Sequence, residues 1–259
     1  RDDLSRVKRY NLVWTKSRNS MYQLRCLTTE EREALMGFPT GWCGGGALTT
    51  TQAAKLLGNA WHVPTIEMLL TGLELPLRNL IDARQIGTRE RPLKVLSFFD
   101  GIGSGWCALY NCLSAWGLEK IHVHYIAIEN DPDCQKVLSM NFPADVKSEQ
   151  GGADSGGQSG DNGQRYHLTQ WGDIRNVSKQ IQEGKHARFL QDVFLCLGGF
   201  PCNNLSGNNR AVGANGRTGL AGPQSSLFYA MDDILTKLGW TNSAAPLPGA
   251  AAGTDVEFE

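Results

Sequence analysis

Cys202 stands in a sequence context that suits a nucleophile. The apolar residues 193–197 predict a buried strand, and the Gly-Gly-Phe-Pro segment after them places Cys202 in a loop. That loop lies at the carboxyl end of a strand, where α/β folds bind ligands. A thiolate there can add to C6 of a cytosine, which turns C5 into an enamine carbon that attacks a sulfonium methyl group. Loss of the C5 proton then expels the thiolate. This chemistry requires a lowered thiol pKa and a group that protonates or hydrogen-bonds N3.

A glycine-rich loop is the second candidate site. Residues 95–99 predict a short strand, and Asp-Gly-Ile-Gly-Ser-Gly follows at 100–105, before a predicted helix. This order brings backbone N–H groups and a helix N-terminus to a ligand. Trp106 occupies the position of the third glycine of a dinucleotide fingerprint, so the spacing favours S-adenosylmethionine over a dinucleotide. A tight turn without a ligand is the structural alternative.

Two acidic residues follow predicted strands. Glu129 comes directly after the strand predicted at 125–128, and Asp173 comes after Gln-Trp-Gly at 170–172. Carboxylate oxygens accept hydrogen bonds, so we expect Glu129 to bind ribose hydroxyls and Asp173 to bind the adenine amino group. Together with the glycine-rich loop, these residues favour a cofactor that contains a nucleoside.

Strands that alternate with helices would position these residues. A capping box at Thr28 and Glu31 predicts a helix that ends at Gly37, and further helices are predicted at 49–57 and after Pro64. Two apolar stripes at helical spacing predict the helices beside the candidate sites: Trp106, Leu109, Leu113 and Trp116, and Leu227, Phe228, Met231, Ile234, Leu235 and Leu238. The predicted fold class is α/β, with a mostly parallel sheet covered on both faces.

Composition excludes several classes of protein. The chain has 259 residues, 41% of them hydrophobic, and a net charge of −1, so no global basic field indicates nucleic acid. No apolar run is long enough to span a bilayer and no signal-peptide pattern opens the chain, so we expect no membrane partner. The 7 Cys include no CxxC pair, which argues against a disulfide framework and a zinc ribbon, and we expect no metal.

Charge and composition vary along the chain. Residues 1–25 carry seven Lys or Arg and two Asp, interleaved with Tyr10, Trp14 and Tyr22. This pattern is typical of an edge that faces nucleic acid, or of a solvated terminal segment. Residues 74–91 are predicted to be a polar linker. The stretches 147–165 and 241–259 are predicted to be a disordered insertion and a disordered tail.

Five segments in the second half of the chain combine into a larger pattern. They are Phe98-Phe99-Asp100-Gly101-Ile102-Gly103-Ser104-Gly105, Ile128-Glu129, Gly172-Asp173-Ile174, Gly198-Gly199-Phe200-Pro201-Cys202-Asn203-Asn204-Leu205-Ser206 and Ser226-Leu227-Phe228. In this order they resemble the first five motifs of the cytosine-C5 DNA methyltransferases. The Asn after Pro-Cys resembles the de novo branch of that family.

Two further segments resemble the last two motifs of the same branch, yet they come first in this chain. They are Leu35-Met36-Gly37-Phe38-Pro39 and Leu57-Gly58-Asn59-Ala60-Trp61-His62-Val63-Pro64. This circularly permuted order is typical of the plant domains-rearranged methyltransferases. The resemblance implies a permuted, Rossmann-like S-adenosylmethionine-dependent methyltransferase fold. Residues 1–73 would hold the last motifs and a remnant of the target-recognition region, and residues 92–240 the cofactor and nucleophile half.

The resemblance also implies a role for individual residues. Cys202 would be the nucleophile. S-adenosylmethionine would be bound by Phe99, Asp100, Gly101, Ile102, Gly103, Ser104, Glu129, Asp173, Ile174, Asn59, Ala60, Trp61 and Leu227. The flipped cytosine and the DNA phosphates would be contacted by Pro201, Asn203, Ser206, Arg210 and Arg217, although simple solvation would also explain the two Arg.

Two elements of the family have no recognised counterpart here. They are a Glu-Asn-Val element that contacts cytosine N3 and an Arg-x-Arg strand near the pyrimidine oxygen. In permuted members both lie upstream of the segment at 57–64, so we expect them before Arg1 and expect this chain alone to turn over poorly.

The leading hypothesis is a nuclear enzyme for de novo methylation of double-stranded DNA. It would form a homodimer, or a heterodimer with a paralogue, through the last helix, unless the apolar face of that helix is plain core. The main alternative is a catalytically incomplete paralogue that binds cofactor and DNA and regulates a complete partner. An RNA cytosine methyltransferase and a dinucleotide oxidoreductase are weaker alternatives.

Overall fold

The computed structural model describes residues 12–16, 21–44, 48–142, 146–147, 165–202 and 219–240. In chain order its elements are β1 (Leu12–Lys16), β2 (Tyr22–Cys26), α1 (Thr29–Met36), α2 (Thr50–Asn59), α3 (Val63–Thr71), α4 (Glu74–Arg84), β3 (Leu93–Phe98), α5 (Ser104–Ala115), β4 (Val123–Ile128), α6 (Pro132–Asn141), β5 (Val146–Lys147), β6 (Tyr166–Trp171), α7 (Ile174–Gln182), α8 (Ala187–Leu190), β7 (Val193–Gly198), η2 (Gly219–Ala221) and α9 (Leu227–Lys237).

A parallel sheet is the centre of the fold. Its strand order is β5-β6-β4-β3-β7, and β5 contributes two residues. Phe98, the last residue of β3, pairs with Ile128 of β4 and with Gly198 of β7. The carboxyl ends of these strands therefore meet at one edge of the sheet. The predicted α/β class and mostly parallel sheet are confirmed.

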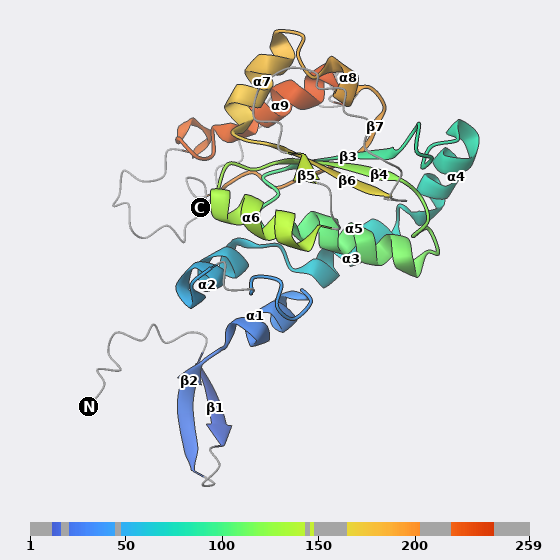
Figure 1. The fold of residues 1–259 in the computed structure, drawn as a ribbon. Coiled ribbons are helices and arrows are strands. Elements are labelled where there is room, and N and C mark those ends of the chain that lie inside the picture. The colour runs from blue at the N-terminus through green and yellow to red at the C-terminus, as the bar shows by residue number, and fades with distance from the viewer. Residues whose placement is uncertain are drawn as a thin grey trace, which may run out of the picture.

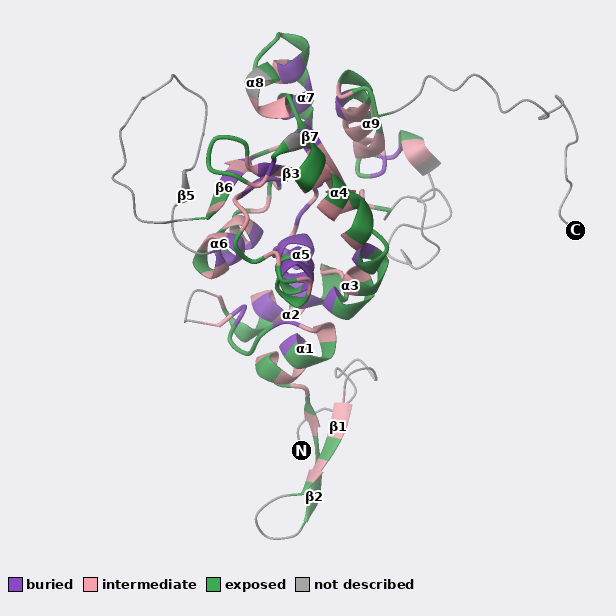
Figure 2. Cartoon of the chain, turned by 90° about the vertical axis from the view of Figure 1, so that its right-hand side faces the viewer, coloured by how far each residue is buried: buried purple, intermediate pink, exposed green. Residues whose placement is uncertain are grey.

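Helices cover both faces of this sheet (Figure 1). One core cluster lies between the sheet and the side of α2, α3, α5 and α6, and a second lies on the side of α7 and α9. Strands buried on both faces read as apolar runs, as β3 does with five of its six residues buried. Helix α5 lies at the centre of the molecule, with eight of its 12 residues buried (Figure 2).

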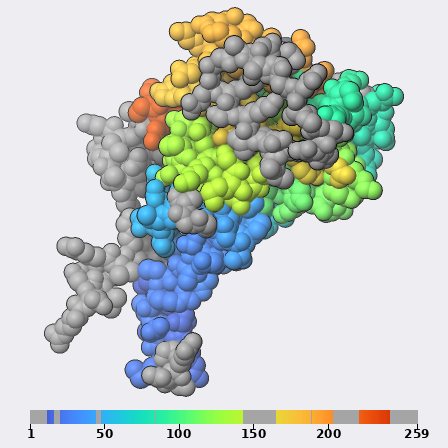
Figure 3. Space-filling view, viewed as in Figure 1, coloured from blue at the N-terminus to red at the C-terminus, as the bar shows by residue number. Residues whose placement is uncertain are grey.

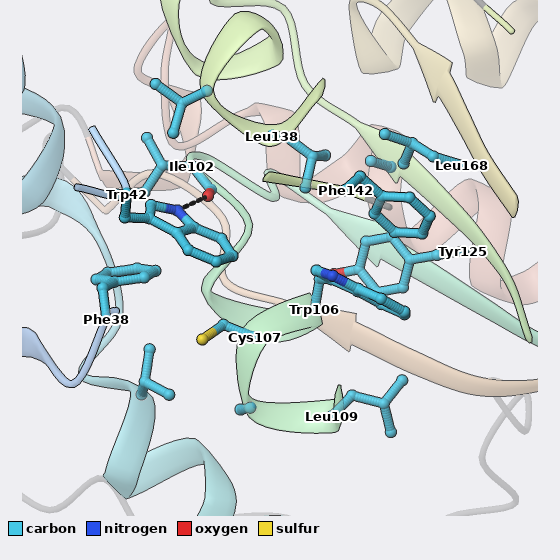
Figure 4. Packing of buried hydrophobic residues seen from close by; sticks show 14 of the residues in the cluster. Phe38, Trp42, Ile102, Trp106, Cys107, Leu109, Tyr125, Leu138, Phe142 and Leu168 are labelled. Carbon is cyan, nitrogen blue, oxygen red and sulfur yellow. Dashed lines mark hydrogen bonds between the residues drawn. The ribbon is translucent and has the colours of Figure 1, made fainter. Parts of the chain in front are cut away.

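The larger core cluster is rich in aromatic side chains. The Trp106 ring lies 4.2 Å from the Phe142 ring and 5.4 Å from the Tyr125 ring, measured between centroids. Figure 4 shows these rings beside the start of α5. They fix α5 against β4, so the loop that joins β3 to α5 starts and ends on rigid elements.

The strands β1 and β2 form an antiparallel hairpin that projects from the body of the molecule (Figures 1 and 3). Trp14 pairs with Leu24 and Lys16 with Tyr22, so these side chains share one face. Trp14 and Tyr22 are 69% and 68% exposed. The hairpin was not predicted, because its alternation is short and its basic residues suggested an irregular terminal segment.

Most predicted helices and strands are present. Thr28 and Glu31 form the expected capping box, and Gly37 ends α1 in the left-handed conformation. The apolar face of α9 packs against the core through Met231, Leu235 and other residues, which supports the interpretation of that face as plain core. The helices α6 and α7 were not predicted; Asp131 and Asp173 cap their N-termini.

The segment 74–91 differs from the expected linker. It contains α4, whose Leu77, Leu80 and Ile81 pack against the larger core cluster. The helical spacing of these three residues outweighs the polar composition around them. Of the predicted insertion, Lys147 lies in β5 and Arg165 is described, while 148–164 and the tail 241–259 lie outside the described residues. No helix within the described ranges is long and apolar enough to cross a membrane.

Candidate active site

A cavity of about 600 Å³ lies where the sheet strands end. Its size is within the range of small-molecule sites. The lining residues come from α2, from the ends of β3, β4, β6 and β7 and from the start of α9: Lys55, Leu56, Asn59, Ala60, Trp61, Phe99, Gly101, Ile102, Ile128, Glu129, Asn130, Asp131, Cys134, Gly172, Asp173, Ile174, Gly199, Phe200, Pro201, Cys202, Gln224 and Leu227. The cavity thus brings together segments from both halves of the chain.

The glycine-rich loop has the conformation that its sequence predicts. Gly101 and Gly103 have φ values of 60° and 85°, a region that glycine enters without a Cβ penalty. Glu129 supports the loop from β4, because its Oε2 accepts a 2.9 Å hydrogen bond from Gly101 N–H. The other carboxylate oxygen, Oε1, accepts from Asp131 N–H at 2.8 Å. Glu129 therefore joins the loop to the start of α6 at the cavity wall.

Asp100 lies beneath the loop and is not among the residues that line the cavity. The hydroxyls of Ser97 and Tyr125 both donate to its Oδ1 at 2.5 Å. Burial raises the pKa of Asp100 to about 6, against the lowering effect of these two hydrogen bonds. Ser104 is also buried and away from the lining. Sequence reasoning found the loop, but it did not find that Asp100 faces the core.

Asp173 is the acidic residue at the end of β6. Its side chain caps α7 by accepting from Arg175 N–H at 2.8 Å, and the Arg175 guanidinium donates to the same carboxylate. These hydrogen bonds lower the pKa of Asp173. The carboxylate remains an ionised acceptor at the cavity, next to Gly172 and Ile174, as the prediction for an adenine contact requires.

The opposite wall is formed by the end of α2. Asn59, Ala60 and Trp61 line the cavity as predicted. The Trp61 indole packs on the backbone of Gly199, where an added Cβ would lie 2.8 Å from Trp61 Cζ2. Gly199 thus lets the α2 wall approach the loop that follows β7.

Cys202 is exposed and lines the same cavity. The carbonyl of Pro201 before it accepts a 3.2 Å hydrogen bond from the Ser225 hydroxyl, and the Phe200 ring lies 5.2 Å from the Phe228 ring. These contacts join the Cys202 loop to the start of α9. Leu227, also predicted, lines the cavity from that helix.

The other predicted cysteine environments differ from that of Cys202. Cys107 and Cys112 are buried and Cys196 is half-buried. Burial raises the pKa of the Cys107 and Cys196 thiols to about 12 and that of Cys112 to about 11. These three thiols are therefore protonated near neutral pH, as expected of structural cysteines.

Four predicted substrate residues cannot be compared with the structure. Asn203, Ser206, Arg210 and Arg217 lie outside the described residues. Conversely, Lys55, Asn130, Asp131, Cys134, Phe200 and Gln224 line the cavity without having been predicted as site residues. Lys55 could have been found from its spacing, because it lies one helical turn before Asn59. Within the described ranges, no three His, Cys, Asp or Glu side chains group so that they could hold a metal ion.

Comparison with known proteins identifies relatives of a single kind. The chain is 30% identical over 232 residues to DNA (cytosine-5)-methyltransferase DRM1 of Arabidopsis thaliana, a match that covers 88% of this chain. It is 28% identical to DNA (cytosine-5)-methyltransferase DRM2 of Arabidopsis thaliana, with 90% of this chain covered. It is also 28% identical to DNA (cytosine-5)-methyltransferase DRM2 of Oryza sativa subsp. japonica, with 93% covered. No family model matches the chain.

These relatives confirm the resemblance to the domains-rearranged methyltransferases that the motifs indicated. The similarity extends along about nine tenths of the chain, so it includes both the cofactor half and the segments at 35–39 and 57–64. The chain spans 30% to 32% of the length of the curated relatives it matches.

Proposed function

We propose that this chain is the cofactor and nucleophile part of a DNA (cytosine-5) methyltransferase. Its relatives bear that name, and the proposed reaction transfers a methyl group from S-adenosylmethionine to C5 of a flipped cytosine. The observation that carries the proposal is that Cys202 lines the same cavity as Glu129 and Asp173. A nucleophile and two acceptors for a nucleoside thus share one site.

The residues of the cavity fit S-adenosylmethionine. The cofactor carries no phosphate, and Trp106 stands where a dinucleotide site has its third glycine, so the loop suits this cofactor better than a dinucleotide. Glu129 would accept from the ribose hydroxyls and Asp173 from the adenine amino group, while Trp61 and Phe99 would cover apolar surface. A Cβ added at Gly101 would have no atom within 4 Å, so the space beside this residue is open. A ligand can therefore approach the loop backbone closely.

Cys202 would carry out the covalent step. Its thiolate adds to C6 of the cytosine, and the electron pair of the C5–C6 double bond moves toward C5 and the ring. When bound, the cofactor would supply an electrophilic sulfonium methyl group to C5; the electron pair of the broken carbon–sulfur bond would stay on the sulfur, leaving S-adenosylhomocysteine. A base then removes the C5 proton, the double bond re-forms, and the thiolate leaves. The exposure of Cys202 is suited to this role, because the flipped cytosine must enter from outside the chain.

The finer features of the proposal follow the resemblance. We propose that the segments at 35–39 and 57–64 are the permuted last motifs, that the enzyme acts on double-stranded DNA in the nucleus, and that methylation is de novo. The role of Asn203, Ser206, Arg210 and Arg217 in contacting DNA, and a dimer with a second copy or a paralogue, remain part of the same proposal.

One sequence observation favours a second function. None of the 259 residues forms a Glu-Asn-Val element, from which the family would supply the acid that contacts cytosine N3. Loss of a general acid costs about 10²–10⁴-fold in rate. We therefore propose as the second candidate that the chain binds cofactor and DNA and regulates a complete partner.

The test is transfer of labelled methyl from S-adenosylmethionine to unmethylated duplex DNA, with Cys202→Ser as the control. We expect slow but measurable transfer by the wild-type chain, and transfer no higher than background by the variant. Equal transfer by both would exclude Cys202 as the nucleophile. If neither transfers methyl but both bind S-adenosylhomocysteine and duplex DNA, the regulatory function is favoured.

A further inference from the structure

Trp42 links the amino-terminal segment to the glycine-rich loop. It lies in the turn after α1, is 7% exposed, and its indole N–H donates a 2.9 Å hydrogen bond to the carbonyl of Ile102. The two residues are 60 positions apart in the chain. Figure 4 shows this bond, with the indole plane lying against the loop. Ile102 is itself a lining residue of the cavity.

The bond restrains the part of the loop that has the most conformational freedom. Ile102 stands between Gly101 and Gly103, both with positive φ, and Gly103, the N-cap of α5, has no side chain with which to cap the helix. The peptide group between Ile102 and Gly103 is held at both ends, because Gly103 N–H donates to the Asp100 carbonyl at 3.2 Å. Without Trp42, the carbonyl end of this peptide would lose its indole donor, and the conformational freedom of Gly103 would ease its rotation.

Trp42 is in turn oriented by Glu33. The Glu33 side chain is fully buried, and its two carboxylate oxygens accept hydrogen bonds of 2.6 Å from Gly41 N–H and Cys43 N–H. These two N–H groups flank Trp42 in sequence. The Trp42 carbonyl also accepts from the Asn141 side chain at 2.7 Å. A buried carboxylate is costly unless it is fully hydrogen-bonded, so this turn is held in one conformation.

We propose that Trp42 is a positioning residue for S-adenosylmethionine, and that Glu33 acts through it. The indole N–H sets the orientation of the Ile102 peptide and hence the shape of the cavity wall that meets the cofactor. Neither residue lines the cavity, so neither contacts the ligand. The inference rests on the proposed function, because it names the cofactor of that site.

The first test compares two Trp→Phe variants of the full chain. Trp42→Phe keeps an aromatic ring and removes the indole N–H. Trp171→Phe is the matched control, because Trp171 is 2% exposed and its indole nitrogen has no partner within the described residues. We expect the dissociation constant for S-adenosylhomocysteine, measured by calorimetry well below the unfolding temperature, to rise at least fivefold in Trp42→Phe and less than 1.5-fold in Trp171→Phe.

The second test examines the route from Glu33, and it also serves if Trp42→Phe does not fold. Glu33→Gln keeps the side-chain volume but leaves one oxygen acceptor for two N–H groups. We expect at least threefold weaker binding from this variant alone. In the Trp42→Phe background it should weaken binding less than 1.5-fold further, because both changes act through the same bond.

Each outcome decides a separate point. No binding of S-adenosylhomocysteine by the wild-type chain overturns the proposed function and this inference with it. If the wild type binds S-adenosylhomocysteine and Trp42→Phe has the same dissociation constant, the inference alone is overturned. If Trp42→Phe does not fold, the same dissociation constant in Glu33→Gln overturns it. Fully additive effects of Glu33→Gln and Trp42→Phe contradict the role assigned to Glu33.

Discussion

The glycine-rich loop after β3 and the Cys202 loop after β7 begin at neighbouring parallel strands, yet the protein holds them differently. The first is held by Glu129, by Trp42, and by the Ser97 and Tyr125 hydroxyls that donate to its buried Asp100. Cys202 itself is exposed, and the carbonyl of Pro201 before it accepts a hydrogen bond from Ser225. The strands differ in the same way, since β3 is buried at five of six positions and β7 at one.

This difference separates two tasks of the proposed enzyme. A preorganised wall lowers the entropic cost of binding a small cofactor. A nucleophile that attacks a flipped cytosine of bound DNA has to be accessible from outside the protein. The chain therefore contains, within its own packing, the support for the cofactor side, while the other side of Cys202 is left for the substrate.

The largest expected effect concerns the rigidity of the glycine-rich loop. Gly103→Ala places a Cβ 2.6 Å from Leu138 Cδ1 at a φ of 85°. Strain of the backbone and overpacking against a buried side chain should together lower the free energy of unfolding by about 3 kcal/mol, measured by urea denaturation. The control is Gly58→Ala in α2, where nothing lies within 4 Å and helix propensity predicts a small gain. A loss below about 1 kcal/mol in Gly103→Ala would show that the loop is not rigid.

The second prediction concerns the pH dependence of the buried support. Burial raises the pKa of Asp100 to about 6, so the folded state takes up this proton at a higher pH than the unfolded state does. The contribution of Asp100 to the unfolding free energy therefore falls as pH rises from about 4 to about 6, by roughly 3 kcal/mol. His124 has the opposite effect, because burial lowers its pKa to about 4 and its contribution is lost on acidification from about 6.5.

Asp100→Asn removes one of these two opposing contributions. Relative to the wild type, the variant should lose roughly 3 kcal/mol of stability between pH 7 and pH 4, and urea unfolding at a series of pH values measures this difference. Parallel profiles for the two proteins would mean that Asp100 ionises in the folded state as it does in the unfolded chain.

The contrast between the two loops also marks how far the sequence could be interpreted. Gly101, Glu129 and Cys202 were found because turn chemistry and strand ends are local signals. The Asp100 side chain points into the core toward Tyr125, and Trp42 bonds to Ile102, which is 60 residues away. Both contacts depend on packing between distant segments, which no local pattern encodes. Helix α4 was interpreted as linker because its polar residues hid three apolar ones at helical spacing. The β1–β2 hairpin was missed because five-residue strands give little alternation to detect.

The third prediction tests Glu129 at the point where the loop meets the cavity. Glu129→Gln leaves one oxygen for the two N–H groups of Gly101 and Asp131 and removes an acceptor proposed for the ribose. We expect affinity for S-adenosylhomocysteine to fall about tenfold, equivalent to about 1.4 kcal/mol, as measured by calorimetry. Glu67→Gln is the control, because that carboxylate accepts from Asn111 away from the cavity. Equal affinity of both variants for S-adenosylhomocysteine would contradict the proposed contact between Glu129 and the cofactor.

The smallest expected effect concerns the hydrogen bond from Ser225 to the backbone just before Cys202. Ser225 is fully buried, and Ser225→Ala removes the donor to the Pro201 carbonyl, which should cost about 1 kcal/mol of stability. Because Cys202 is the next residue, its sulfur should be placed less accurately, and the methyl-transfer rate should fall about tenfold with affinity for S-adenosylhomocysteine unchanged. Ser226→Ala, whose hydroxyl donates to Pro223 instead, should change neither quantity. If Ser225→Ala weakened cofactor binding and left the rate intact, the two loops would form one rigid unit, and the division of tasks between them would be wrong.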